Sequence, residues 1–350
     1  MLLMKMEEID KNFKTVTKIE KEGIKFYNIQ DEPFKIYGVK YENGLFRRIP
    51  EDVAKSVSEG VYALHTKPVG GRVRFKTDSK YVAVSLKVEN VNLTAILVLT
   101  GVASCDIYAD NIFKGTYRTP FEVETEYEGV LENVTDGTLK NITIGLPNHA
   151  FVREMYVGLD ENARLLPPEP YKIETPVVYY GSSITQGCCS SRPGMSYEAI
   201  VARRLDCNYI NLGFAGNAKG EDAIAHYIKG LKMSAFVYDY DHNAPTPEHL
   251  EATHERMFKI IREAQPALPV VMMPRPKMYL NDEEKKRREI VIKTYENALK
   301  SGDKNVYYID NTELIALCGN EGTLEGLHPS DFGFNSMAKA VGDCLEKILF

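Results

Sequence analysis

VVYYGSSITQG, residues 177–187, is the segment that decides the fold of the C-terminal half of this 350-residue chain. Four apolar residues run directly into a glycine and two serines, which is typical of a buried strand that ends in a tight turn. Gly181 permits the sharp turn, and Ser183 lies where the strand ends and a helix can begin. A hydroxyl at that place would project from the sheet edge, close to the positive end of a helix dipole.

Short apolar runs and helical stretches alternate along the whole region that follows this segment. This alternation predicts βαβ units and a parallel, doubly wound sheet, in which ligands bind at the carboxyl ends of the strands. The predicted strands are residues 177–180, 207–213, 235–240, 269–274 and 306–310. The predicted helices are residues 196–205, 221–232, 247–264, 282–301 and 336–349.

The region before residue 165 has a different sequence pattern, with alternating β-branched residues and Gly, Asn and Asp breaks but no amphipathic helix pattern of useful length. This pattern predicts an all-β sandwich or jelly roll. A proline-rich segment, residues 165–176, separates the two patterns, so we expect an all-β domain over 1–165 and an α/β domain over 166–350. The predicted strands are residues 61–67, 71–77, 81–88, 94–100, 105–110, 141–147 and 154–160.

A second polar motif, EGLHPSDFGF at residues 325–334, places Glu325 three residues before His328. An acid in such a loop can orient the imidazole and fix the tautomer that accepts a proton from a serine hydroxyl. Taken singly, Ser183 could be a helix N-cap and His328 a structural loop histidine. Together they indicate a nucleophile and its base.

These residues resemble the sequence blocks of the SGNH (GDSL-like) hydrolase family. Gly181 to Thr185 is similar to the GDSI-T block, with Ser182 in place of the aspartate, and Glu325 and His328 are similar to the final DxxH block. The resemblance implies a flavodoxin-like sheet and a serine esterase with Ser183 as nucleophile, His328 as base and Glu325 as acid.

Two further blocks imply the oxyanion hole. NLGFAGN, residues 211–217, is similar to the glycine block, and YDYDHNAP, residues 238–245, matches the GxND block through its asparagine alone. The resemblance therefore implies oxyanion donors from the backbone N–H groups of Ser183 and Gly216 and from the amide of Asn243. In the preceding domain, Asp106, Ile107 and Tyr108 resemble the Gly-x-Asp-Leu-Tyr element of a β-sandwich module found before some SGNH hydrolases.

Other interpretations of these motifs remain open at this point. Asp239, Asp241 and His242 are residue types that bind metals, although they could equally cap a strand, and serine chemistry needs no metal or cofactor. Cys188 or Cys189 could be a nucleophile, but a free cysteine is more often a small buried hydrophobe. The charge run at residues 282–289 is expected to be a solvated helix face, with the i,i+4 pairs Glu283–Arg287 and Glu284–Arg288.

SGNH enzymes that carry a β-sandwich in front resemble carbohydrate esterases, which implies removal of O-acetyl groups from xylan- or mannan-type oligosaccharides. Arg192, Tyr197 and Arg275 are candidates for hydrogen bonds to sugar hydroxyls. The chain contains no Trp, so any stacking platform must be Tyr or Phe. The alternatives are a lipid or thioester acylhydrolase and a non-catalytic carbohydrate-binding protein.

The net charge and the hydropathy of the chain disfavour some classes of binding partner. A net charge of −6 disfavours nucleic acid and anionic membranes, and no apolar run approaches the length of a membrane span. The N-terminal apolar stretch is too short for a signal sequence, and six scattered cysteines suit a reducing compartment, so we expect a cytoplasmic protein. The expected partner is an acetylated oligosaccharide, and a homo-oligomer is compatible with the sequence.

Overall fold

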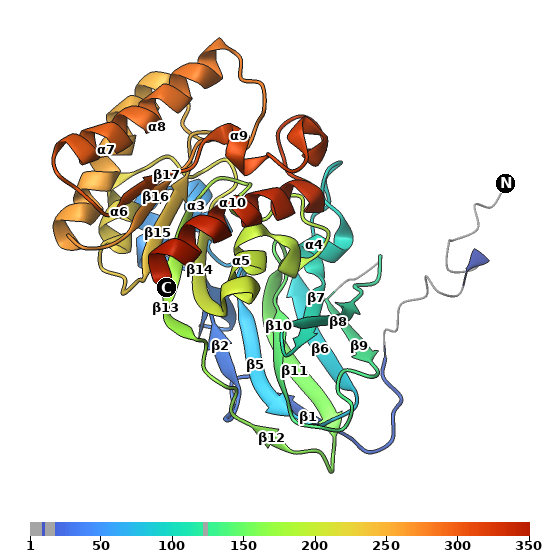
Figure 1. Ribbon diagram of the computed structural model, residues 1–350. Helices are drawn as coiled ribbons and strands as arrows, with labels where there is room; N and C mark the ends of the chain where they lie inside the picture. Colours follow the sequence, from blue (N-terminus) through green and yellow to red (C-terminus); the bar gives the residue numbers. More distant parts are fainter. Residues whose placement is uncertain (1–8, 11–17, 122–124) are drawn as a thin grey trace.

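The structure is a computed structural model that describes residues 9–10, 18–121 and 125–350. An antiparallel β-sandwich is followed by an α/β domain, and the two lie against each other along one side (Figure 1). Among the described residues, no helix is long and apolar enough to cross a membrane.

The first part of the chain packs two antiparallel sheets face to face around a common apolar core. Alternation explains the packing: Val82, Val84, Leu86 and Val88 point inward from one strand and are fully buried. One sheet contains β1 (Ile24–Asn28), β11 (Phe151–Asp160), β6 (Val82–Glu89) and β9 (Glu126–Leu131), in that order. The other contains β12 (Leu165–Leu166), β5 (Arg72–Thr77), β10 (Lys140–Gly145), β7 (Cys105–Ala109) and β8 (Ile112–Tyr117), with β2 (Lys35–Tyr37) also paired to β5.

The second part is a parallel sheet of order β14-β13-β15-β16-β17, which is the flavodoxin-like order. Alternate residues of β13 face opposite layers: Tyr179 packs with α5 and α10, whereas Tyr180 packs with α6 and α7. The predicted fold class is therefore confirmed. The strands are β13 (Ile173–Gly181), β14 (Cys207–Gly213), β15 (Ala235–Asp239), β16 (Val270–Met272) and β17 (Val306–Tyr308). The helices are α5 (Tyr197–Leu205), α6 (Asp222–Ile228), α7 (Pro247–Ala264), α8 (Asp282–Lys300), α9 (Asn311–Leu314) and α10 (Asp331–Leu349).

Two predicted strands are wrong. Residues 61–67 fall on the helix α3 (Glu59–Leu64) and the turn that follows it, and residues 94–100 fall on irregular structure, a turn and the start of α4 (Leu99–Ala103). The hydroxyl of Ser58 caps α3 by accepting the N–H of Val61 at 3.2 Å. Tertiary packing of a few buried apolar side chains overrides the β propensity of these short segments.

The segment around α3 does not join the sandwich core. A short hairpin, β3 (Lys40–Glu42) and β4 (Leu45–Arg47), leads into α2 (Glu51–Val57) and α3. Ile49, Ala54 and Val61 are buried in the same core cluster as the apolar residues of the parallel sheet. Residues early in the chain thus cover one layer of the α/β domain.

Candidate active site

Three polar loops leave the parallel sheet side by side. Gly181, the last residue of β13, is in register with the last residues of β14 and β15. The segments that carry Ser183, Gly216 and Asn243 therefore begin at the same level of three adjacent strands. We call residues 213–217 the Gly216 loop and residues 240–246 the Asn243 loop.

The turn after β13 is tight. A side chain at Gly181 would collide with the carboxylate of Asp239, so the position accepts only glycine. Ser182, in the place of the family aspartate, is fully buried and its Oγ accepts the N–H of Ile184 at 3.2 Å. The half-buried Ser183 follows directly.

Ser183, His328 and Glu325 form a continuous hydrogen-bonded chain. Ser183 Oγ lies 2.9 Å from His328 Nε2. On the other side of the ring, His328 Nδ1 contacts Glu325 Oε1, which also accepts the His328 N–H at 3.3 Å. Because Nδ1 faces a carboxylate, it carries the proton, and Nε2 presents its lone pair to the serine hydroxyl.

The loop that carries Glu325 and His328 is held by a hydrogen bond within itself, and the start of the helix after it is bound by the loop that follows the nucleophile. The N–H of Leu324 donates to the carbonyl of His328 at 2.9 Å, which closes the turn that holds Glu325 and His328 together. The N–H of Ser191 donates to Asp331 Oδ1 at 2.8 Å, at the start of α10. The Glu325 side chain is 39% exposed, against 16% for His328, so solvent weakens the electrostatic effect of this acid.

The Asn243 loop is joined to Ala218, the residue that directly follows the Gly216 loop. Asn243 Oδ1 accepts the N–H of Ala218 at 3.3 Å, so the amide presents its Nδ2 hydrogens on the opposite side. Gly216 is exposed and has a φ of 72°, a left-handed conformation that favours glycine. Both predicted donors therefore lie on loops beside the one that carries Ser183.

Asp239 is a site residue whose role the sequence analysis missed. It is buried at the end of β15, where its carboxylate contacts Thr185 Oγ1 in the nucleophile turn. Burial raises the pKa of Asp239 to about 8, while the Thr185 hydroxyl, which donates to the carboxylate, opposes the rise. A signal was available: Asp239 and Gly181 both end strands of the sheet.

Asp239 and Asp241 each contact protein groups rather than each other, since Asp241 pairs with Arg275. Within the described part of the chain, no group of three His, Cys, Asp or Glu residues is arranged to hold a metal ion.

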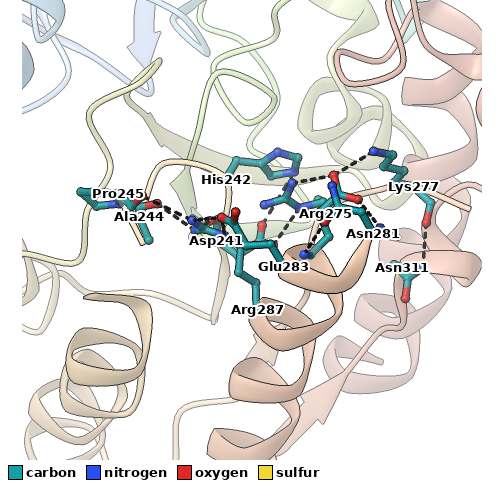
Figure 2. A network of polar contacts seen from close by, with 11 residues as sticks. Asp241, His242, Ala244, Pro245, Arg275, Lys277, Asn281, Glu283, Arg287 and Asn311 are labelled. Atoms are coloured by element: carbon teal, nitrogen blue, oxygen red, sulfur yellow. Dashed lines mark hydrogen bonds and ion pairs between the residues drawn. The ribbon is translucent and has the colours of Figure 1, made fainter. Parts of the chain in front are cut away.

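The Asn243 loop is held by a buried charged network from α8 (Figure 2). Arg287 Nη1 donates to the carbonyls of Asp241 and Ala244, both at 2.8 Å, on either side of Asn243. Arg287 also pairs with Glu283 at 2.8 Å, which confirms that predicted i,i+4 pair.

The expectation of a solvated face for the whole charge run is wrong. Glu284 and Arg287 are only 7% and 5% exposed, because they face the loop instead of the solvent. Glu284 binds Arg275 at 3.0 Å and Lys277 at 2.8 Å, whereas Arg288 binds Asp310, so the predicted Glu284–Arg288 pair is also wrong.

The same network corrects the prediction for Arg275. Its guanidinium donates to Asp241 Oδ2 at 3.2 Å and to Glu284 Oε1, and the residue is 9% exposed (Figure 2). The two carboxylates bind its Nε and Nη1 groups, so the side chain is buried in the network and turned away from solvent. Arg275 stabilises the network behind the Asn243 loop.

Arg192 is also engaged within the protein. It donates to Asp106 Oδ2 at 2.8 Å, contacts the hydroxyl of Tyr108, and stacks 3.9 Å above the ring of Phe113. The N–H of Gly194 donates to the same carboxylate at 2.8 Å. Arg192 and Gly194 thus bind the Asp106–Tyr108 element, which holds the loop after the nucleophile to the β-sandwich, and the sugar contact of Arg192 stays a prediction.

Tyr197 and the two vicinal cysteines are buried. Tyr197 is 1% exposed and packs edge-on against Tyr179, so it cannot meet a sugar as predicted. Burial raises the pKa of Cys188 and of Cys189 to about 12, which disfavours a thiolate nucleophile at either position.

The chain matches two protein-family models, one over each part of the sequence. Residues 174–346 match the model of the GDSL-like lipase/acylhydrolase family. Residues 24–165 match the model of the GxDLY N-terminus of SGNH-hydrolase-type esterases. The chain belongs to the GDSL-like hydrolases. It is thus an esterase or acylhydrolase by family, with the Asp106–Tyr108 element in its N-terminal module.

Solved structures share the arrangement of both domains. A GDSL-like protein from Bacteroides ovatus is 26% identical, with a TM-score of 0.82 over 93% of this chain and 98% of its own. A salicylyl-acyltransferase from a tetracycline biosynthetic pathway is 20% identical, with a TM-score of 0.78 over 94% of this chain and 99% of its own. An acetyl xylan esterase from Butyrivibrio proteoclasticus is 13% identical, with a TM-score of 0.60 over 93% and 98%. Comparison with curated proteins gave no match.

Proposed function

We propose that this GDSL-like hydrolase is a serine esterase that removes O-acetyl groups from xylan- or mannan-type oligosaccharides through an acyl-enzyme. The observation that carries the proposal is the series of hydrogen-bond contacts between three side chains. Ser183 Oγ lies 2.9 Å from His328 Nε2, and His328 Nδ1 contacts the carboxylate of Glu325. A neutral imidazole in this tautomer can take the serine proton as the oxygen attacks a carbonyl.

In the proposed mechanism, Ser183 Oγ bonds to the ester carbonyl carbon while His328 Nε2 takes its proton. The N–H groups of Ser183 and Gly216 and the amide of Asn243 stabilise the tetrahedral oxyanion. The C–O bond to the sugar then breaks, and His328 returns the proton to the departing hydroxyl. Water, deprotonated by the same histidine, releases acetate and restores Ser183.

The saccharide substrate is the more specific part of the proposal, and it has its own support, separate from that of the serine mechanism. Its support is the two-domain likeness to carbohydrate esterases, among them a family two enzyme from Clostridium thermocellum crystallised with cellohexaose, with a TM-score of 0.56 at 14% identity. At that identity the likeness concerns the fold, so substrate assays must decide the sugar.

The test is release of acetate from acetylated xylo-, manno- and gluco-oligosaccharides. We expect turnover by the wild type on the first or second panel, and a loss of at least about 10⁴-fold in kcat for Ser183→Ala. His328→Ala should lose activity comparably, with unchanged thermal unfolding for both variants. Wild-type turnover in Ser183→Ala would refute the serine mechanism.

Acyl-chain length separates the saccharide esterase from a lipid or thioester acylhydrolase. We expect 4-nitrophenyl acetate to be hydrolysed faster than the octanoate. Preference for octanoate, with no acetate released from the oligosaccharides, would replace the substrate class while keeping the serine mechanism. A chain that binds acetylated oligosaccharide but does not react with a serine-directed phosphonate would be a non-catalytic binding protein.

A further inference from the structure

The N-terminal module meets the catalytic domain at the loop that follows Ser183. Thr100 Oγ1 donates to the carbonyl of Ser191 at 2.6 Å, and Asn148 Nδ2 donates to Ser190 Oγ at 3.0 Å. A side chain at Gly101 would collide with the carbonyl of Ser190. The module therefore lies in close contact with the segment that begins at the nucleophile.

One histidine of the module extends this contact to the Gly216 loop. Gln186 Nε2 lies 3.1 Å from Nδ1 of His149, and Gln186 Oε1 accepts the N–H of Ala215 at 2.8 Å. Ala215 directly precedes Gly216. A buried bridge of two side chains thus runs from the module to the residue beside the proposed oxyanion donor.

The amide of Gln186 has a defined orientation in this bridge. A glutamine amide can place its oxygen and its nitrogen in either of two orientations. The N–H of Ala215, which can only donate, binds Oε1, and Nδ1 of His149, as an acceptor of the Nε2 hydrogen, holds the same orientation from the other side. The other ring nitrogen, Nε2, lies 3.5 Å from Cys188 Sγ, a weak acceptor to which it can donate when it carries the proton. Burial and the cations Lys67 and Arg48 lower the pKa of His149 to about 3, so the ring is neutral and Nδ1 remains an acceptor.

A second residue of the module holds the other end of the same loop. Arg48, buried and only 4% exposed, donates to the carbonyls of Gly213 and Leu64, and its guanidinium lies 4.5 Å above the ring of Phe214. Residues 213 to 215 are therefore fixed from the module at both ends.

We propose that His149 is a positioning residue of the esterase, which acts through Gln186 to fix the backbone at Ala215 and Gly216 as oxyanion donor. This inference rests on the proposed function. It makes the N-terminal module a functional part of the active site, and it predicts that a residue outside the catalytic domain controls kcat.

The test compares His149→Leu, Gln186→Leu and the double variant with 4-nitrophenyl acetate as substrate. Loss of the acceptor frees the amide, and a small displacement of a catalytic donor costs about tenfold to a hundredfold in rate. We expect kcat to fall by that factor with KM nearly unchanged, and the double variant to lose no more than either single variant. His149→Asn, whose Oδ1 can replace Nδ1 as acceptor, should restore most of kcat. His226→Leu, at an exposed histidine of α6, is the matched control.

The outcomes separate this inference from the proposed function. Wild-type kcat in folded His149→Leu and Gln186→Leu, with activity lost in Ser183→Ala, would overturn the positioning role and leave the esterase standing. Additive losses in the double variant would also overturn it. If the wild type hydrolyses no ester, both proposals fail. Should His149→Leu not fold, the comparison of Gln186→Leu with His149→Asn decides.

Discussion

The Gly216 loop and the Asn243 loop leave strands on either side of β13, yet they are held by different parts of the chain. The Gly216 loop is fixed from the N-terminal module through His149, Gln186 and Arg48. The Asn243 loop is fixed inside the catalytic domain, by Arg287 of α8. The two proposed oxyanion donors thus depend on supports from different parts of the chain, and each support can be removed by its own substitution.

Removal of a donor itself should have the largest effect. Asn243→Ala deletes the amide proposed to bind the oxyanion, and loss of one such donor commonly costs about 10²–10³ in kcat. We expect that loss with an unchanged KM for 4-nitrophenyl acetate. A decrease of less than about threefold would exclude Asn243 from the oxyanion hole, since one lost neutral hydrogen bond is worth about 1 kcal/mol.

Loss of the support for Asn243 should have the next largest effect. Arg287→Lys keeps the charge but not the planar fork, so the carbonyls of Asp241 and Ala244 cannot both be bound in the same geometry. We expect kcat to fall about tenfold to a hundredfold. Arg288→Lys, the neighbouring and more exposed arginine, is the control and should leave kcat within about twofold, since its pair with Asp310 is near the surface. Equal effects of the two variants would contradict the comparison.

His149 lies next to the Gly216 loop and His242 lies within the Asn243 loop, and both side chains are largely shielded from solvent, which predicts sensitivity to acid. Burial lowers the pKa of each to about 3, whereas the unfolded chain takes up the proton near pH 6.5. The unfolded state therefore binds more protons between about pH 6.5 and 3, and the free energy of unfolding falls as the pH falls through that window. Each histidine contributes about 1.4 kcal/mol per pH unit.

Urea unfolding at pH 6.5 and at pH 5 measures this effect. His242→Asn should reduce the difference in the free energy of unfolding between the two pH values relative to the wild type. An unchanged difference would mean that His242 is protonated in the folded protein.

The smallest effect is expected at the backbone of the Gly216 loop. Gly216 has a φ of 72° with open space around the position of a side chain, so Gly216→Ala meets backbone strain and no clash. Such strain costs about 1 kcal/mol, which corresponds to a decrease of roughly 2–4 °C in Tm. We expect kcat to fall only a few-fold. A gain in Tm would show that the loop does not keep this conformation in solution.

The parallel sheet and its site loops could be predicted because their signals are local. Each buried strand of the α/β domain is a short apolar run, and each site motif directly follows one, so the register of β13 with its neighbours brings Ser183 to the Gly216 and Asn243 loops. The N-terminal region was predicted less completely, because short segments such as residues 59–64 obtain their helical structure from burial against distant residues of the α/β domain.

Arg192, Tyr197 and Arg275 show the limit of site prediction. Each follows a strand or lies near the nucleophile in sequence, and each was therefore a candidate for sugar binding. Which partner a side chain meets is decided by elements far away in the chain: Asp106 for Arg192, Tyr179 for Tyr197, and Glu284 for Arg275. The spacing of residues in the sequence does not indicate which distant side chains will be their partners.

The sequence by itself determined the α/β and β-sandwich classes and the set of polar residues that follow the strands, because periodicity and turn chemistry are properties of short segments. Only the tertiary structure decided that His149 reaches Gln186 and that Arg287 binds both sides of Asn243. Those contacts join segments tens of residues apart, and a hydrogen bond forms only where folding has already brought donor and acceptor within about 3 Å.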